Sequence, residues 1–229
     1  MVSFRVAHSA LFAFYIRLQE YDAQRDTIIR RSRDMQKAAK TAVYCLHRND
    51  FAAAARELTA VETVAAELQP LITAESTLRS GSFTAAIEEY AEARIFKHYL
   101  EHGCLLPSTA MALATRDEYL GGLLDFTGEL NRFAVLRATA RDVAAVKRAR
   151  DVVDAIFGAM LQFDLRNGPA RKKFDSLKYT LKKLESLLYE LQLAGPFQST
   201  RMDGPDGAGA DNAPQGEGGA AKDMDDDDA

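Results

Sequence analysis

Apolar residues recur every three or four positions along most of the chain, and no segment keeps a sustained alternation of apolar and polar residues. This period is typical of helices that bury one face, whereas strict alternation would indicate strands. Proline and glycine stand at breaks between the periodic segments, where helices end. The pattern predicts an all-α fold, a bundle of six to seven helices. The pattern predicts the ends of six helices, over residues 4–48, 51–68, 83–102, 108–138, 141–165 and 169–194.

The helix expected over residues 169–194 has the most regular pattern. Its apolar residues are spaced alternately by three and four positions, as in the seam of a coiled coil. They are Phe174, Leu177, Leu181, Leu184, Leu188 and Leu191. Two interpretations stay open, because such a seam can face the core of the bundle or form an interface between subunits.

The composition of the chain changes abruptly at Asp203. Residues 203–229 contain 9 acidic residues and one basic residue, and they are rich in glycine. Residues 1–202 contain 28 basic and 24 acidic residues, so the net charge of −4 combines a mildly basic body with a strongly acidic tail. The tail has little apolar surface to offset the entropy of ordering. We therefore predict one α-helical domain over residues 1–202 and a disordered, acidic, glycine-rich tail over residues 203–229.

Cysteine usage and the start of the chain indicate the compartment. The two cysteines, Cys45 and Cys104, form no CxxC pair, which favours a reducing environment over a disulfide framework. The apolar residues near the start are interrupted by Arg5, His8 and Arg17, so we expect neither a signal peptide nor a membrane span. These features predict a soluble protein of the cytoplasm, with the nucleus as a second compartment, and no membrane partner.

Two pairs of carboxylates lie within the predicted helices. Glu89 and Glu92 are three positions apart in one helix, and Asp125 and Glu129 are four positions apart in the next. Both spacings place the two carboxylates on one face of their helix. Asp125 interrupts an apolar run and has no basic residue three or four positions away. Two such faces opposed across a bundle would form a cluster of hard oxygen ligands suited to Mg²⁺ or Mn²⁺.

A cluster of this kind supports phosphoryl transfer without a nucleophilic side chain. The competing interpretation is structural, with the carboxylates paired to arginines such as Arg94 and Arg132. Spacing alone favours this structural interpretation. His98 and His102 are four positions apart but lack the HExxH pattern of a zinc site, so we expect them at the surface near a helix end.

Basic residues form stripes along the first and the last predicted helix. Such stripes can follow a phosphate backbone, although they are more often solvated helix faces. The candidate nucleic-acid-binding residues are Arg30, Arg33, Lys37, Lys40, Arg171, Lys172, Lys173 and Lys178. Aromatic residues that could stack on bases are not interleaved with them, so recognition of a particular base sequence is not supported.

Four segments, taken in order, resemble the translin family, which comprises translin and translin-associated factor X. They are AVYCLHR (42–48), EEYAEARIFKHYL (88–100), EYLGGLLDFTGELNR (118–132) and LRNGPARKKFDSLKYTLKKLESLLYEL (165–191). The resemblance implies a helical bundle that assembles into hollow octamers of one or two kinds of subunit. The mixed assembly of the family is a metal-dependent endoribonuclease that acts on short single-stranded RNA. Its substrates include fragments of the passenger strand in RNA silencing and remnants of tRNA processing.

The resemblance also implies roles for single residues. The segments 89–93 and 125–130 match the two acidic motifs of factor X. Glu89, Glu92, Asp125 and Glu129 are therefore the implied catalytic residues and metal ligands, with Mg²⁺ or Mn²⁺ as cofactor. In this respect the resemblance overturns the preference drawn from spacing alone.

The chain combines this factor-X-like acidic quartet with a last helix that looks like that of translin. Two main functions stay open. One is a Mg²⁺-dependent endoribonuclease subunit that acts on short or processed RNAs, and the other is a non-catalytic subunit that binds single-stranded RNA or DNA. A helical scaffold is a third. The family resemblance implies a homo-octamer, or a hetero-octamer with another translin-family subunit.

Overall fold

The computed structural model describes residues 2–195, with side chains from residue 10 onward. This part of the chain forms six α-helices and two short 3₁₀ helices and contains no strand, which confirms the predicted all-α bundle. The helices are α1 (Val2–His47), α2 (Phe51–Ala74), η1 (Ser76–Arg79), α3 (Ser82–His102), η2 (Ser108–Ala110), α4 (Arg116–Thr139), α5 (Val143–Met160) and α6 (Pro169–Leu193). The tail predicted over residues 203–229 lies outside the described residues, so the division after residue 202 stays a prediction.

Three helix boundaries differ from those predicted. The start of α4 was wrong: the helix begins only after Thr115, whose side chain caps the N–H of Glu118 while the Glu118 carboxylate accepts from the N–H of Thr115. α2 continues past Pro70, because its last turn still buries Ile72 in the core. α5 ends at Met160 rather than at residue 165.

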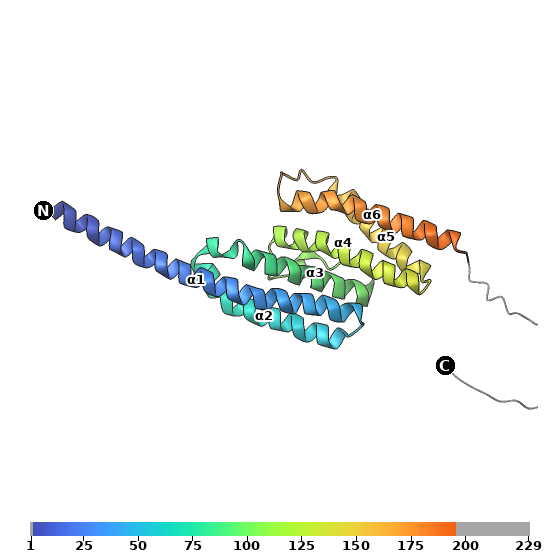
Figure 1. Ribbon diagram of the computed structural model, residues 1–229, viewed down its shortest axis with the longest axis horizontal. Helices are drawn as coiled ribbons and strands as arrows, with labels where there is room; N and C mark the ends of the chain where they lie inside the picture. Colours follow the sequence, from blue (N-terminus) through green and yellow to red (C-terminus); the bar gives the residue numbers. More distant parts are fainter. Residues whose placement is uncertain (1, 196–229) are drawn as a thin grey trace, which may run out of the picture. The chain divides into compact units, whose positions relative to one another are not determined.

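The helices pack as a series of neighbours. α1 and α2 form an antiparallel hairpin, α3 lies against α1, and α4 lies against α3 (Figure 1). α6 and α5 complete the bundle on the far side of α4. Because α1, α3, α4 and α6 follow one another in this order, side chains from all four can meet along one face.

The leucine seam of α6 faces the interior of the bundle. Leu177 and Leu184 are completely buried, and the other four seam residues are partly buried against the core. Phe174, at the start of the seam, stacks on Phe157 of α5 with 5.6 Å between ring centroids. The structure therefore supports the core interpretation of the seam.

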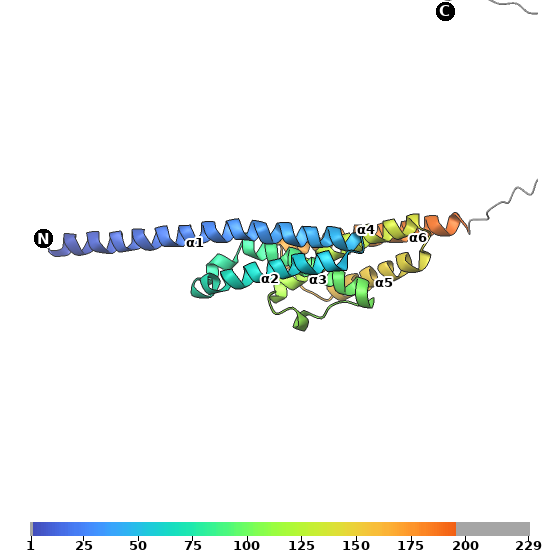
Figure 2. The ribbon, with the colours of Figure 1, turned by 90° about the horizontal axis from the view of Figure 1, so that it is seen from below.

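The N-terminal half of α1 extends beyond the rest of the bundle (Figure 2). From residue 10 to residue 18 its large apolar side chains are exposed, and the first buried one among the described side chains is Ile28. The exposed residues are Leu11, Phe12, Phe14, Tyr15, Ile16 and Leu18. A contiguous apolar surface of this kind is typical of an interaction site. Within residues 2–195, no helix is both long and apolar enough to cross a membrane.

A buried glutamate connects α4 to η1 and α3. Glu118 is 2% exposed and accepts hydrogen bonds from Arg79 Nε at 3.1 Å and Arg79 Nη2 at 2.6 Å. It also accepts from the Thr84 hydroxyl at 3.1 Å, while Arg79 Nη2 donates to the Leu113 carbonyl at 2.9 Å. This carboxylate is fully engaged in structural contacts and is not available to a ligand.

Candidate metal and nucleic-acid site

Two consecutive glycines bring α3 and α4 into close contact. A Cβ on Gly121 would lie between 2.6 and 2.9 Å from the carboxyl atoms of Glu88. A Cβ on Gly122 would lie 2.6 Å from Ala91 Cβ and 2.7 Å from the Glu88 carbonyl oxygen. At Gly122 the contacts are with the backbone and Ala91 of α3, so only glycine allows the approach there, whereas the flexible end of Glu88 can move away from a Cβ on Gly121. The glycine pair therefore places the carboxylates of α3 directly against α4.

The four predicted carboxylates come together around Glu92. Glu89 and Glu92 belong to α3, Asp125 and Glu129 belong to α4, and all four are half-buried. Burial, together with the negative charges of Asp125, Glu89 and Glu129, raises the pKa of Glu92 to about 8. The charge of Lys173 opposes it. Negative charge is thus concentrated at this point of the bundle.

Two side chains of α1 pair with the carboxylates at the edge of the cluster. Lys40 Nζ lies 3.1 Å from Glu89 Oε1, and His47 Nε2 lies 2.5 Å from Glu129 Oε2. The His47 ring also packs on Phe96, with 4.8 Å between centroids. The hydrogen bond with His47 lowers the pKa of Glu129 and outweighs the opposing effect of burial. α1 therefore holds two of the four carboxylates in place.

Lys173 of α6 reaches the cluster from the opposite side. Its Nζ donates to Asp125 Oδ2 and to Glu88 Oε2, at 2.6 Å in both cases, and lies 3.4 Å from the Gly121 carbonyl oxygen. Burial lowers the pKa of Lys173, but the hydrogen bonds with Asp125 and Glu88 raise it by more, so the pKa lies above its ordinary value. Within the described residues, Glu92 has no ion-pair partner of its own.

Two members of the cluster, Glu88 and His47, were not among the site residues predicted from the sequence. His47 follows Lys40 by seven positions, which places both on one face of α1, so helical spacing is a signal that could identify it. Glu88 carries no such signal. Its role depends on the space that Gly121 leaves on α4.

The predicted nucleic-acid-binding residues divide into two groups. Lys40 and Lys173 pair with carboxylates of the cluster, Lys40 from a largely exposed position, and the others are exposed along α1 and α6. The exposed residues are Arg30, Arg33, Lys37, Arg171, Lys172 and Lys178. Because α1 packs on α3 and α6 packs on α4, the exposed basic residues belong to the two helices that flank the acidic ones.

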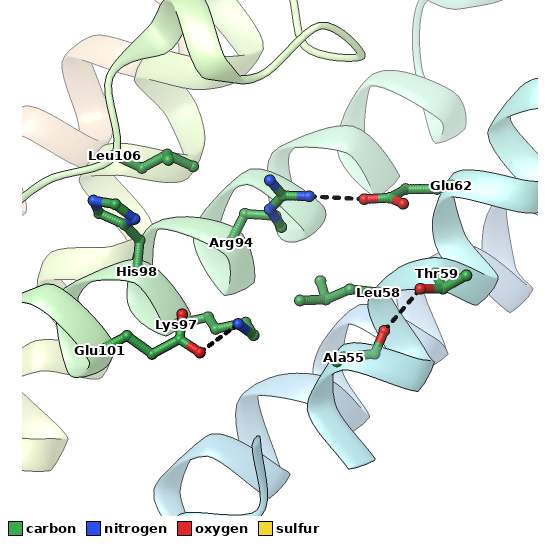
Figure 3. A pocket seen from close by; sticks show the side chains of 9 residues that line it. All are labelled: Ala55, Leu58, Thr59, Glu62, Arg94, Lys97, His98, Glu101 and Leu106. Atoms are coloured by element: carbon green, nitrogen blue, oxygen red, sulfur yellow. Dashed lines mark hydrogen bonds and ion pairs between the residues drawn. The ribbon is translucent and has the colours of Figure 1, made fainter. Parts of the chain in front are cut away.

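The arginines considered as structural partners of the quartet behave differently from each other. Arg94 points toward α2, where its Nη1 donates to Glu62 Oε1 at 2.8 Å (Figure 3). Arg132 Nη1 lies 3.5 Å from Glu129 Oε2. His98 lines the same shallow cavity as Arg94, between α2 and α3. The structural interpretation therefore holds for Arg132 and fails for Arg94.

The donor chemistry of the cluster suits a hard divalent cation, because three carboxylates crowd Glu92, which forms no ion pair with any basic residue in the described part of the chain. Across residues 2–195, however, no three acidic, imidazole or thiol groups are placed so that they could hold a metal ion. The ammonium of Lys173 lies between two of the carboxylates and supplies positive charge there. The residues thus fit a cation by charge and chemistry, provided that side chains such as Lys173 move.

Comparisons with known proteins agree with this fold. A family model described as the Translin family matches residues 23–195. Translin of Gallus gallus is 34% identical over 79 residues, and Translin of Homo sapiens is 32% identical over 79 residues. The match covers 34% of this chain, and 34% and 35% of the length of these relatives.

Solved structures are similar over most of the chain. The crystal structure of apo-NeC3PO has a TM-score of 0.72 at 20% sequence identity, covering 79% of this chain and 96% of that one. The structure of an AfC3PO–duplex RNA complex has a TM-score of 0.69 at 21% identity, covering 81% of this chain and 97% of that one. At these identities the similarity establishes the shared fold.

Proposed function

The chain belongs to the Translin family, and we propose that it is a single-stranded nucleic-acid-binding protein that acts as a Mg²⁺-dependent endoribonuclease subunit on short or processed RNAs. Mn²⁺ is the alternative cofactor. One observation carries the proposal: Asp125, Glu89 and Glu129 crowd the buried Glu92 and help to raise its pKa to about 8. Such crowding costs free energy without a cation and is typical of functional sites.

A divalent cation, when bound, supplies a more acidic water and neutralises charge on the scissile phosphate. Glu92 and Asp125 would be its central ligands, since Glu92 lies in the middle of the cluster without a partner of its own. Glu89 and Glu129 would complete the set from positions that Lys40 and His47 maintain. The exposed basic residues of α1 and α6 would bind phosphates on either side of the cluster.

The alternative function is a non-catalytic subunit that binds single-stranded RNA or DNA. The ion pairs of Lys40 and Lys173 and the hydrogen bond between His47 and Glu129 favour it, because they supply partners to three of the four carboxylates without a metal. In that case the cluster would serve only to join α1, α3, α4 and α6. Nucleic acid would then bind to the exposed basic residues alone.

We further propose that the chain works in an oligomer, either a homo-octamer or a hetero-octamer with another translin-family subunit, in the cytoplasm and the nucleus. The apolar residues exposed on the N-terminal half of α1 support an assembly, since they remain unburied in the single chain. One structural relative is an AfC3PO–duplex RNA complex, which supports a nucleic-acid partner.

The deciding experiment measures cleavage of end-labelled single-stranded RNA by the full-length protein with Mg²⁺, Mn²⁺ or EDTA. We expect cleavage only with the metals, and its loss in Asp125→Asn, while RNA binding in a gel-shift assay is kept or strengthened because repulsion of phosphates is reduced. The matched control is Glu185→Gln, which changes an exposed carboxylate of α6. RNA binding without cleavage under every condition would establish the non-catalytic alternative.

A further inference from the structure

Of the two lysines at the carboxylate cluster, Lys173 is held more firmly. Its ammonium lies 2.6 Å from both Asp125 and Glu88, and its side chain is 25% exposed. Lys40, the other lysine at the cluster, makes one contact of 3.1 Å and is 67% exposed. The ammonium of Lys173 is therefore part of the cluster, whereas that of Lys40 lies at its edge.

Packing fixes the backbone of Lys173 but not its side chain. α6 begins at Pro169, and the next residue after the lysine, Phe174, stacks on Phe157 of α5. Leu177 is buried one turn later. The ammonium itself is carried by a flexible four-carbon stem. It can therefore leave the cluster without any change in the bundle.

Lys173 and a divalent cation compete for the carboxylate of Asp125. Asp125 Oδ2 accepts the hydrogen bond of Lys173, and Asp125 is also a ligand in the proposed metal site. Two positive charges on one carboxylate repel each other, so binding of the cation is opposed while the ammonium stays. Lys172 and Arg171 are exposed on the same turn of α6, where a displaced ammonium would join them.

We propose that Lys173 is a resident counter-ion of the cluster, which a divalent cation displaces from Asp125 and Glu88, and that its released ammonium binds a phosphate of the single-stranded nucleic acid. This inference rests on the proposed function. It makes metal and nucleic acid bind with positive cooperativity, because each of them favours the released position of the same lysine.

Titration of the full-length protein with Mn²⁺, followed by electron paramagnetic resonance of the free ion, tests the displacement. Lys173→Met and Lys173→Gln should each bind Mn²⁺ on the order of tenfold more tightly than the wild type, within the usual range of coupling between sites. Lys182→Met removes the same charge from an exposed position of α6 and should change little. Unchanged or weaker Mn²⁺ binding in both folded Lys173 variants would overturn the inference.

The cooperativity is tested by repeating the titration with a short single-stranded DNA oligonucleotide, which offers the phosphates that the released ammonium would bind. It should tighten Mn²⁺ binding by about fivefold or more in the wild type and not in Lys173→Met. Equal tightening in both proteins would show that Lys173 is not the link. If Asp125→Asn abolishes Mn²⁺ binding while Lys173→Met leaves it unchanged, the inference fails and the metal site stands. If the wild type and both Lys173 variants bind no Mn²⁺, the proposed metal site fails as well.

Discussion

Replacement of Glu92 by glutamine measures the repulsion within the cluster, because it removes a charge and keeps the shape of the side chain. In the folded protein, burial and the charges of Asp125, Glu89 and Glu129 raise the pKa of Glu92 from 4.5 to about 8. In the unfolded chain its pKa is near the ordinary value. The folded state therefore holds the proton of Glu92 more firmly than the unfolded state, so stability falls as the pH rises.

The loss of stability is confined to the pH range between these two pKa values. Below about pH 4.5 both states are protonated and the contribution of Glu92 is complete, and it declines until about pH 8. Within this range each pH unit costs up to about 1.4 kcal/mol. Between pH 5 and pH 8 this gives up to about 4 kcal/mol, and solvent screening of the half-buried site lowers it to about 1–4 kcal/mol. Glu92→Gln avoids this loss, so its stability relative to the wild type should rise by that amount from pH 5 to pH 8.

The assay is urea unfolding followed by circular dichroism at pH 5, 6.5 and 8, with EDTA present. Other titrating groups cancel in the difference between variant and wild type, and the exposed Glu185→Gln serves as the control. Parallel pH dependences for the wild type and Glu92→Gln would refute the reasoning. Addition of Mg²⁺ at pH 8 should stabilise the wild type more than Glu92→Gln, since a ligand of the folded state stabilises it more the more tightly it binds.

Two further predictions concern the contacts that position α4. Gly122→Ala should destabilise the protein by about 1–3 kcal/mol in urea unfolding, because its methyl group meets the backbone of α3. Gly128→Ala, on an open face of the same helix, should instead stabilise the protein by about 0.5–1 kcal/mol. Similar effects of the two substitutions would disprove the close approach. Glu118→Gln should cost about 3–5 kcal/mol in thermal or urea unfolding, because Arg79 loses its buried charged partner; a cost below 1 kcal/mol would show that the pair contributes little.

The helical period correctly predicted which segments form helices, because each helix of the bundle must bury one apolar face. It could not locate the start of α4. Ser108 follows a proline and resembles an N-cap, but residues 108–110 form only the short helix η2. The reciprocal hydrogen bonds of Thr115 and Glu118, reinforced by Arg79, place the true start later. Arg79 belongs to η1, far from Glu118 in the sequence, so local sequence patterns do not predict this contact.

The candidate site could also be predicted in part from the sequence. Spacing put Glu89 with Glu92 and Asp125 with Glu129, and the family resemblance supplied the expectation that the two pairs meet. The physical means of meeting is the glycine pair, Gly121 and Gly122, whose meaning is clear only once α3 and α4 are known to be neighbours.

The basic stripes show why charge patterns on single helices overcount nucleic-acid contacts. Spacing treats Lys37 and Lys40 alike, as it does Lys172 and Lys173, yet in each pair the second lysine contacts a carboxylate of the neighbouring helix. Lys40 remains largely exposed in this contact, whereas Lys173 is mostly buried in it. A lysine that faces an acidic cluster is neutralised within the protein unless a stronger cation takes its place. The exposed residues therefore supply affinity for phosphates at all times. Lys173 would contribute only when the cluster holds metal, so the metal itself would regulate how strongly this surface binds nucleic acid.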